Sequence, residues 1–150
     1  MVTGCNTQKN VPVFSRVVCE GNDVYNENLL EYYELYKPIF QDAYPDPAIA
    51  RKGDDYYLVA SSFAMFPGVP IFHSNDLVNW TQIGHVLDRK SQLKVFDTGI
   101  SAGIYAPDIR YNPHNDTFYM ITTQFAGGFG NMIVKTKDPM QGWSDPFKLN

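Results

Sequence analysis

The stretch YPDPAIARKGDDYYLVA, residues 44–60, decides the fold of this chain. It places a run of strand-forming residues before the turn cluster at 52–55 and another run, rich in Tyr, Leu and Val, after it. Outward from this stretch, strand-like runs alternate with turn clusters, at 48–51, 56–62, 69–74 and 80–83. Four short runs joined by short turns predict a four-stranded antiparallel meander.

The same unit recurs in the second half of the chain, with runs at 108–111, 118–123, 131–137 and 143–149. Matched residues of the two copies are offset by 60 to 63 positions: Pro47 and Pro107, Ile49 and Ile109, Tyr57 and Tyr119, Asp76 and Asp138, Trp80 and Trp143. The repeat and its shared Asp-turn-Trp ending favour propeller blades over two independent hairpin sheets. Closed propellers need about four or more blades. The sequence therefore predicts an all-β fold, a β-propeller of which this chain holds about two blades as an open fragment.

The composition narrows the function classes. Apolar residues make up 44% of the chain and aromatic residues 15%, which argues against disorder and favours strands. The net charge is −4 and no basic run stands out, so nucleic acid is not an expected partner. No stretch approaches the roughly 20 apolar residues of a membrane span. The two cysteines form no CxxC or Cys/His cluster, so no metal site is expected in this chain.

The chain is expected to divide into an N-terminal tether, a lead-in and a partial propeller, at 1–10, 11–43 and 44–150. The tether contains Val2-Thr3-Gly4-Cys5, which has the pattern of a bacterial lipobox, although only four residues precede Cys5. On this interpretation the protein is exported to the bacterial cell envelope or beyond it, and a lipid on Cys5 is its link to a membrane. A chance match is the alternative. In the lead-in, the apolar spacing over 26–40 predicts a short helix that Pro38 would end.

The predicted topology gathers candidate functional residues on one rim of the propeller. The start of a blade's first strand and the end of its antiparallel second strand lie on the same rim. Carboxylates, an amide and aromatic rings are expected there, from Asp46, Phe63, Tyr105, Asp108, Gln124, Phe125 and the loop 127–130. Such convergence around a channel mouth is how a small polar ligand site is usually built.

Asp46 has a distinctive local context, because it stands between Pro45 and Pro47. The proline rings fix their own φ angles, and Pro47 also restricts Asp46. A carboxylate on so stiff a segment suits a positioned general base. It suits an Asx-type turn equally well, in which the carboxylate accepts local backbone N–H groups. The residues by themselves leave both interpretations open.

Linked motifs give the chain a resemblance to glycoside hydrolase family 43 over about 37–150. They are KPIF at 37–40 with YPDPAI at 44–49, GDDYY at 53–57, SF and FPGV within 62–69, HSNDLVNW at 73–80, GIYAPDIRY at 103–111 and GWSDP at 142–146. The segment VLDRKSQL at 86–93 is similar to the β-xylosidase and α-L-arabinofuranosidase branch of that family.

The resemblance implies a five-bladed β-propeller and an inverting glycosidase with three acidic residues. Asp46 corresponds to the general base, and Phe63 and Tyr105 correspond to aromatic positions that line the sugar subsite, Tyr105 standing where Trp is usual. Asp108 is interpreted as a structural or subsite residue. The two remaining acids of the family are expected beyond Asn150. The resemblance also leaves open a structural calcium ion in a complete propeller.

The leading functional hypothesis is therefore hydrolysis of O-glycosidic bonds in plant cell-wall polysaccharides, with xylo- or arabino-oligosaccharides as substrates. A propeller that binds glycans without cleaving them is the main alternative, and a structural or interaction propeller is a third. Since the two remaining catalytic acids are expected beyond Asn150, residues 1–150 alone are predicted to show no turnover.

Overall fold

The computed structural model describes residues 40, 43–93, 99, 101–125 and 130–149. The expected tether with Cys5, nearly all of the lead-in with its predicted helix, and residues 127–129 of the predicted rim loop lie outside these residues. Within the described ranges, no helix is long and apolar enough to cross a membrane.

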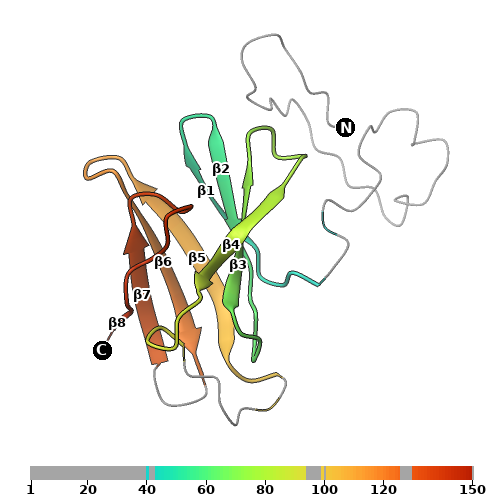
Figure 1. The fold of residues 1–150 in the computed structure, drawn as a ribbon, viewed down its shortest axis with the longest axis vertical. Helices are drawn as coiled ribbons and strands as arrows, with labels where there is room; N and C mark the ends of the chain where they lie inside the picture. The colour runs from blue at the N-terminus through green and yellow to red at the C-terminus, as the bar shows by residue number, and fades with distance from the viewer. Residues whose placement is uncertain (1–39, 41–42, 94–98, 100, 126–129, 150) are drawn as a thin grey trace, which may run out of the picture.

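The described chain forms two four-stranded antiparallel sheets, each a meander in chain order. The first sheet consists of β1 (Ala48–Lys52), β2 (Asp55–Val59), β3 (Gly68–Ser74) and β4 (Thr81–Leu87). The second consists of β5 (Ile104–Asn112), β6 (Thr117–Gln124), β7 (Gly130–Thr136) and β8 (Phe147–Lys148). β1 lies against β5, so the first strands of the two sheets are neighbours, as they are around a propeller axis (Figure 1). The all-β prediction of two propeller blades is confirmed.

The strand ends differ from the predicted runs where tertiary contacts intervene. β5 begins at Ile104 and not at Asp108, and its register with β6 shifts between Tyr105 and Asp108. That shift is a β-bulge, which a propensity pattern does not reveal because it inserts residues without changing composition. β8 is shorter than its predicted run and covers two residues. The difference at β5 matters most, because it lies on the predicted functional rim.

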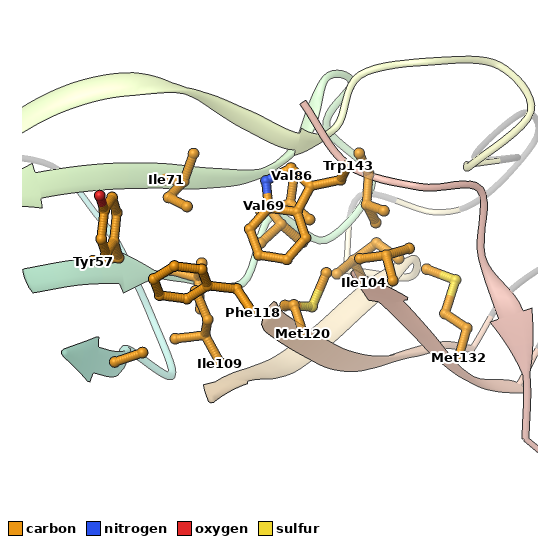
Figure 2. Packing of buried hydrophobic residues seen from close by; sticks show 14 of the residues in the cluster. Tyr57, Val69, Ile71, Val86, Ile104, Ile109, Phe118, Met120, Met132 and Trp143 are labelled. Carbon is orange, nitrogen blue, oxygen red and sulfur yellow. The ribbon is translucent and has the colours of Figure 1, made fainter. Parts of the chain in front are cut away.

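The hydrophobic core lies between the two sheets. Alternate residues of β6 and β7 point toward the first sheet, as period-two strands require, with Phe118, Met120, Met132 and Val134 almost completely buried. Figure 2 shows three of them, Phe118, Met120 and Met132, on the side of the second sheet that faces Val69, Ile71 and Val86 of the first sheet. The Tyr57 ring meets the Phe118 ring edge-on, with centroids 5.0 Å apart. This packing fixes the two sheets relative to each other.

The two repeat tryptophans lie on the same side of their own sheets. Trp143 is buried between the sheets, on the side of the second sheet that faces the first (Figure 2). Trp80 is half-buried beside Ile49 and Leu58, which alternate with core residues and so face away from the second sheet. The sequence repeat thus corresponds to a repeated orientation of the indole within each unit.

A second connection between the sheets comes from the segment after β4. The side chain of Gln92 is buried; its Oε1 accepts the amides of Asp88 and Arg89, and its Nε2 donates to the carbonyls of Trp143 and Ser144. A fully paired buried amide of this kind specifies one arrangement, because any shift leaves polar atoms unsatisfied.

The strand directions give the molecule two rims. The turn rim carries the hairpins β1–β2, β3–β4 and β5–β6, which lie together in Figure 1. The site rim is at the other ends of these strands. It contains the segments 44–47, 61–63, 103–107 and 124–125, which precede β1, follow β2, open β5 and close β6.

Candidate active site

Asp46 lies on the site rim, two residues before β1, and its side chain is exposed. Its backbone has a φ of +53°, in the left-handed region that Asp tolerates better than most residues. The segment is attached to the end of β2, because the amide of Ser61 donates to the carbonyl of Pro45 over 2.8 Å. The stiffness predicted from the flanking prolines is therefore combined with a left-handed residue and a direct bond to the neighbouring strand.

The Asp46 carboxylate is held by one side chain. The hydroxyl of Ser61 donates to Asp46 Oδ2 over 2.7 Å, and the same hydroxyl accepts the amide of Ala106 over 2.7 Å. Among the described residues, no backbone N–H donates to this carboxylate, so the Asx-turn alternative does not describe its geometry. Asp46 is exposed, and its Oδ1 has no hydrogen bond to a described residue.

Phe63 joins the two sheets at this rim. Its amide donates to the carbonyl of Ile104 over 3.1 Å, and the amide of Ile104 donates back over 2.9 Å. Phe63 has a φ of +49°, which is unfavourable for a bulky side chain and marks a conformation imposed by its surroundings. Gly103 makes this approach feasible, because a Cβ at that position would lie 2.1 Å from the Phe63 carbonyl oxygen.

Three aromatic rings lie in a row on the site rim, which also carries Asp46. The Phe63 and Tyr105 rings are 5.7 Å apart at 76°, and the Tyr105 and Phe125 rings are 6.2 Å apart at 82°. Phe63 and Tyr105 are half-buried and Phe125 is 75% exposed. The Tyr105 hydroxyl donates to the carbonyl of Ser101. The row presents apolar ring edges and faces to solvent at the mouth of the rim.

The bulge in β5 brings the second sheet to Asp46. Ala106 adopts a φ of +40° within it, and its amide turns toward Ser61. On the other side, Thr122 Oγ1 donates to the carbonyl of Tyr105 over 2.7 Å, and Thr122 is buried. The bulge is thus bonded from both sheets, which fixes where the Tyr105 ring and the Ala106 amide lie.

Asp108 differs from the other predicted rim residues. It lies in β5 after the bulge and forms an ion pair with Arg110 Nε at 3.1 Å. No hydrogen bond or ring contact among the described residues joins Asp108 to Asp46, Phe63 or Tyr105. The structure therefore joins Phe63, Tyr105 and Phe125 by ring contacts and links Asp46 to the same rim through Ser61 and Ala106. Asp108 instead forms an exposed pair with Arg110. The described residues contain no cluster of three or more His, Cys, Asp or Glu that could hold a metal ion, so no step is assigned to calcium.

Sequence reasoning missed Ser61 and Gly103 as parts of this site. Ser61 and Ser62 directly follow the apolar run Leu58–Ala60, and both are 2% exposed. Two hydroxyls at the buried end of a strand need partners, so this position was a signal that could have been used. Gly103 gave no comparable signal, because its partner is the backbone of Phe63, 40 positions away in the sequence.

Comparison with known proteins gives one consistent result. A family model described as "Glycosyl hydrolases family 43" matches residues 35–150. Over 112 residues, 75% of this chain, it is 57% identical to a xylosidase/arabinosidase of Butyrivibrio fibrisolvens. It is 46% identical, again over 112 residues, to a non-reducing end alpha-L-arabinofuranosidase of Bacteroides ovatus. The chain spans about a fifth of the length of these relatives, 21% in each case.

Solved structures agree with the curated relatives. A GH43_12 protein retrieved from a capybara gut metagenome superposes with a TM-score of 0.74 at 66% identity, covering 83% of this chain and 24% of that protein. A xylan beta-1,4-xylosidase from Bacillus halodurans superposes with a TM-score of 0.68 at 43% identity, covering 75% of this chain and 22% of that protein. These family neighbours are five-bladed β-propellers, so the two sheets described above correspond to two of five blades.

Proposed function

This chain belongs to the glycosyl hydrolases of family 43, and from that membership we propose that it supplies the water-activating side of a glycosidase active site. The proposed substrates are xylo- or arabino-oligosaccharides from plant cell-wall polysaccharides. The proposal for substrate class rests on the relatives, whose names include xylosidase and arabinofuranosidase. The proposal for the site rests on the rim geometry.

The observation that carries the site proposal is the state of Asp46. Its carboxylate is exposed, is anchored through one oxygen by Ser61, and lies on the rim that also carries the Phe63 and Tyr105 rings. A general base needs a fixed carboxylate with a free oxygen that a water molecule can reach. An Asp with a purely structural role would instead engage both oxygens in local hydrogen bonds, as Asp76 does on the turn rim.

The proposed reaction is a single displacement with inversion. Asp46 Oδ1 accepts a proton from a water molecule as that water attacks the anomeric carbon of the terminal sugar. A carboxylic acid on the opposite side protonates the leaving oxygen, and the bond to the anomeric carbon breaks. In inverting glycosidases the two carboxyl groups are about 6.5–9.5 Å apart, which leaves room for the water. We assign no residue of this chain to the acid.

The aromatic row has a separate proposed role, which is to hold the terminal sugar. Sugar rings present C–H groups on their faces, and these pack well against aromatic side chains. Phe63 and Tyr105 are half-buried and fixed by the inter-sheet bridge and the bulge, so they offer a preformed surface at little entropic cost. Phe125 at the exposed end of the row would contact the next sugar unit or solvent.

The test is an isosteric change of the base in a polypeptide that combines this chain with the remaining length of a family 43 enzyme. Asp46→Asn should lower kcat on aryl xylosides or arabinofuranosides by at least about a thousandfold, because the amide cannot accept the proton. Asp54→Asn, a turn-rim carboxylate paired with Arg51, is the matched control and should retain wild-type rates. Proton NMR of the first product should show the inverted anomer in the parent protein.

Three results would argue against this proposal: an active Asp46→Asn variant, a product of retained configuration, or robust turnover by residues 1–150 alone. Sugar binding by Asp46→Asn without turnover would agree with the proposed division between the base and the aromatic row. Sugar binding without turnover by the parent protein would favour the glycan-binding alternative.

We also propose that Cys5 carries a lipid anchor at the bacterial cell envelope, on the pattern of Val2-Thr3-Gly4 before it. Expressed with its native upstream sequence, the protein should fractionate with membranes, and Cys5→Ala should release it. Equal partitioning of both forms would show the pattern to be accidental.

A further inference from the structure

We propose that Ser61 is a positioning residue for Asp46, which orients the carboxylate and ties it to the second sheet. This inference rests on the proposed function, because it gives Ser61 a role through Asp46. Ser61 is 2% exposed, so it acts from beneath the site. Three of its hydrogen bonds carry the argument.

The direction of the Ser61 hydroxyl follows from its partners. A hydroxyl has one proton to donate and lone pairs to accept with. The backbone amide of Ala106 can only donate, so over 2.7 Å the Ser61 oxygen must act as its acceptor. The single hydroxyl proton is then directed to Asp46 Oδ2, also at 2.7 Å. This relay, from the Ala106 amide to the Ser61 hydroxyl to the Asp46 carboxylate, therefore runs in one direction.

The relay selects which carboxylate oxygen is available. With Oδ2 engaged by Ser61, the carboxylate cannot rotate freely, and Oδ1 has no hydrogen bond to a described residue. Ser61 would therefore keep Asp46 in the orientation that a general base requires.

The relay also sets the base relative to the sugar-binding rings. The Ser61 amide holds Pro45, its hydroxyl holds Asp46, and its acceptor contact reaches Ala106 in the bulge of the second sheet. Ala106 directly follows Tyr105 in that bulge. One buried side chain thus links the base to the position beside the ring, so a small movement between the sheets would be transmitted to Asp46. Displacements of about 1 Å in the residues that support a catalytic group lower the rate of catalysis strongly.

Ser62 provides an internal contrast. It is as buried as Ser61, but its hydroxyl accepts the amide of Val69 over 3.0 Å and lies on the core side. Removing either hydroxyl leaves a backbone amide without its acceptor. Only the Ser61 hydroxyl also contacts the proposed base, so the pair separates a structural effect from a positioning effect.

The experiment compares Ser61→Ala with Ser62→Ala in the same family 43 enzyme that is used for the Asp46 test. Ser61→Ala should lower kcat by about 10–100-fold, the range typical of supporting partners around a site, while KM changes by less than about twofold because the rings are untouched. This fall in kcat at nearly constant KM is the readout that a merely structural role would not give. Ser62→Ala should cost similar stability by thermal unfolding and leave both kcat and KM close to the parent's.

Ser61→Cys covers the case in which the Ala variant does not fold. It retains most of the side-chain volume but replaces the hydroxyl by a weak donor, and it should show the same fall in kcat at nearly constant KM. Unchanged kcat in a folded Ser61 variant would overturn the proposal, as would an equal kinetic effect of Ser62→Ala. If Asp46→Asn were also fully active, the proposed function itself would fail. If Asp46→Asn were inactive and Ser61 variants unaffected, only the role of Ser61 would be wrong.

Discussion

The two rims of this molecule hold their left-handed residues by different contacts. On the turn rim, positive φ angles fall on Gly53, Leu77 and Asp116, each inside the turn of a hairpin. On the site rim they fall on Asp46, Phe63 and Ala106, and for Phe63 and Ala106 they are costly. The site-rim residues are held in this state by bonds between the sheets, whereas the turn-rim residues lie in turns within one hairpin. Strain that the surrounding structure maintains is a mark of functional sites.

The largest effect is expected from the glycine that lets the sheets approach at the site rim. In Gly103→Ala the new Cβ would lie 2.1 Å from the Phe63 carbonyl oxygen and 2.5 Å from its carbon, and φ is +130°. Because both contacts are backbone atoms, the Phe63–Ile104 bridge must break, and unfolding free energy should fall by about 3–5 kcal/mol. Urea unfolding of the family 43 enzyme measures it.

Gly53→Ala on the turn rim is the matched control. Gly53 is also left-handed, with a φ of +61°, but nothing lies within 4 Å of a Cβ there. The cost should be limited to the backbone strain of about 1 kcal/mol. Equal losses for the two variants would mean that the site rim is not held by the close approach of Phe63 and Gly103.

The second effect concerns the Asp turns that the sequence repeat matched. Asp76 accepts hydrogen bonds from the Ser74 hydroxyl, the Val78 and Asn79 amides and the Asn79 side chain. Its counterpart Asp138 accepts the Met140 amide. Asp76→Ala should therefore cost about 1–2 kcal/mol and Asp138→Ala about half as much, by urea unfolding.

The stability that Asp76 contributes should depend on pH. The bonds from Asn79 hold the pKa of Asp76 well below its usual range. A carboxyl with a depressed folded pKa contributes stability that is present above its unfolded pKa of about 3.9 and is lost as pH falls through the folded value. Parent and Asp76→Ala melting temperatures should converge below about pH 4. A constant gap down to strongly acidic pH would contradict this origin.

The contrast between the rims also explains how far the sequence could predict this structure. The repeat located both sheets and grouped Asp46 with Phe63 and Tyr105 on one rim, because strand direction follows from local patterns of residues. It could not locate the bulge at Ala106 or the left-handed Phe63, since these conformations contradict local preference and are imposed by contacts with distant residues. Ser61 belongs to the same class, as its partner Ala106 is 45 positions away.

A third prediction tests the strain at the bulge directly. Ala106→Gly retains the amide that donates to Ser61 but removes the Cβ that disfavours a φ of +40°. Relief of about 1–2 kcal/mol of backbone strain is partly offset by the greater freedom of Gly in the unfolded chain, about 0.5–1 kcal/mol. We expect a small net gain, about 0.5 kcal/mol in urea unfolding. Asp116→Gly should lose stability instead, because Asp tolerates this conformation and the change also removes the carboxylate that bonds Lys52 and Tyr111. A loss in both variants would indicate that Ala106 carries no strain.

The smallest effect is expected from the ion pair that joins the two sheets at the turn rim. Lys52 Nζ contacts Asp116 Oδ1 and lies 5.2 Å from the Tyr111 ring, whose hydroxyl donates to Asp116 over 2.7 Å. The hydrogen bond from Lys52 lowers the pKa of Asp116 and the same bond raises the pKa of Lys52. The contribution of Asp116 is thus lost as pH falls below about 3.9, and that of Lys52 as pH rises above about 10.4. Both groups are exposed, so salt should screen the pair.

A double-mutant cycle of Lys52→Met and Asp116→Asn should give a small coupling in melting temperature at neutral pH that vanishes in about 1 M salt. The same cycle on Arg51 and Asp54, 3.8 Å apart within one hairpin, should show still less, because that pair joins no separate elements. A coupling at Lys52 and Asp116 that matched the loss in Gly103→Ala would mean that both rims, and not the site rim alone, hold the two sheets in place.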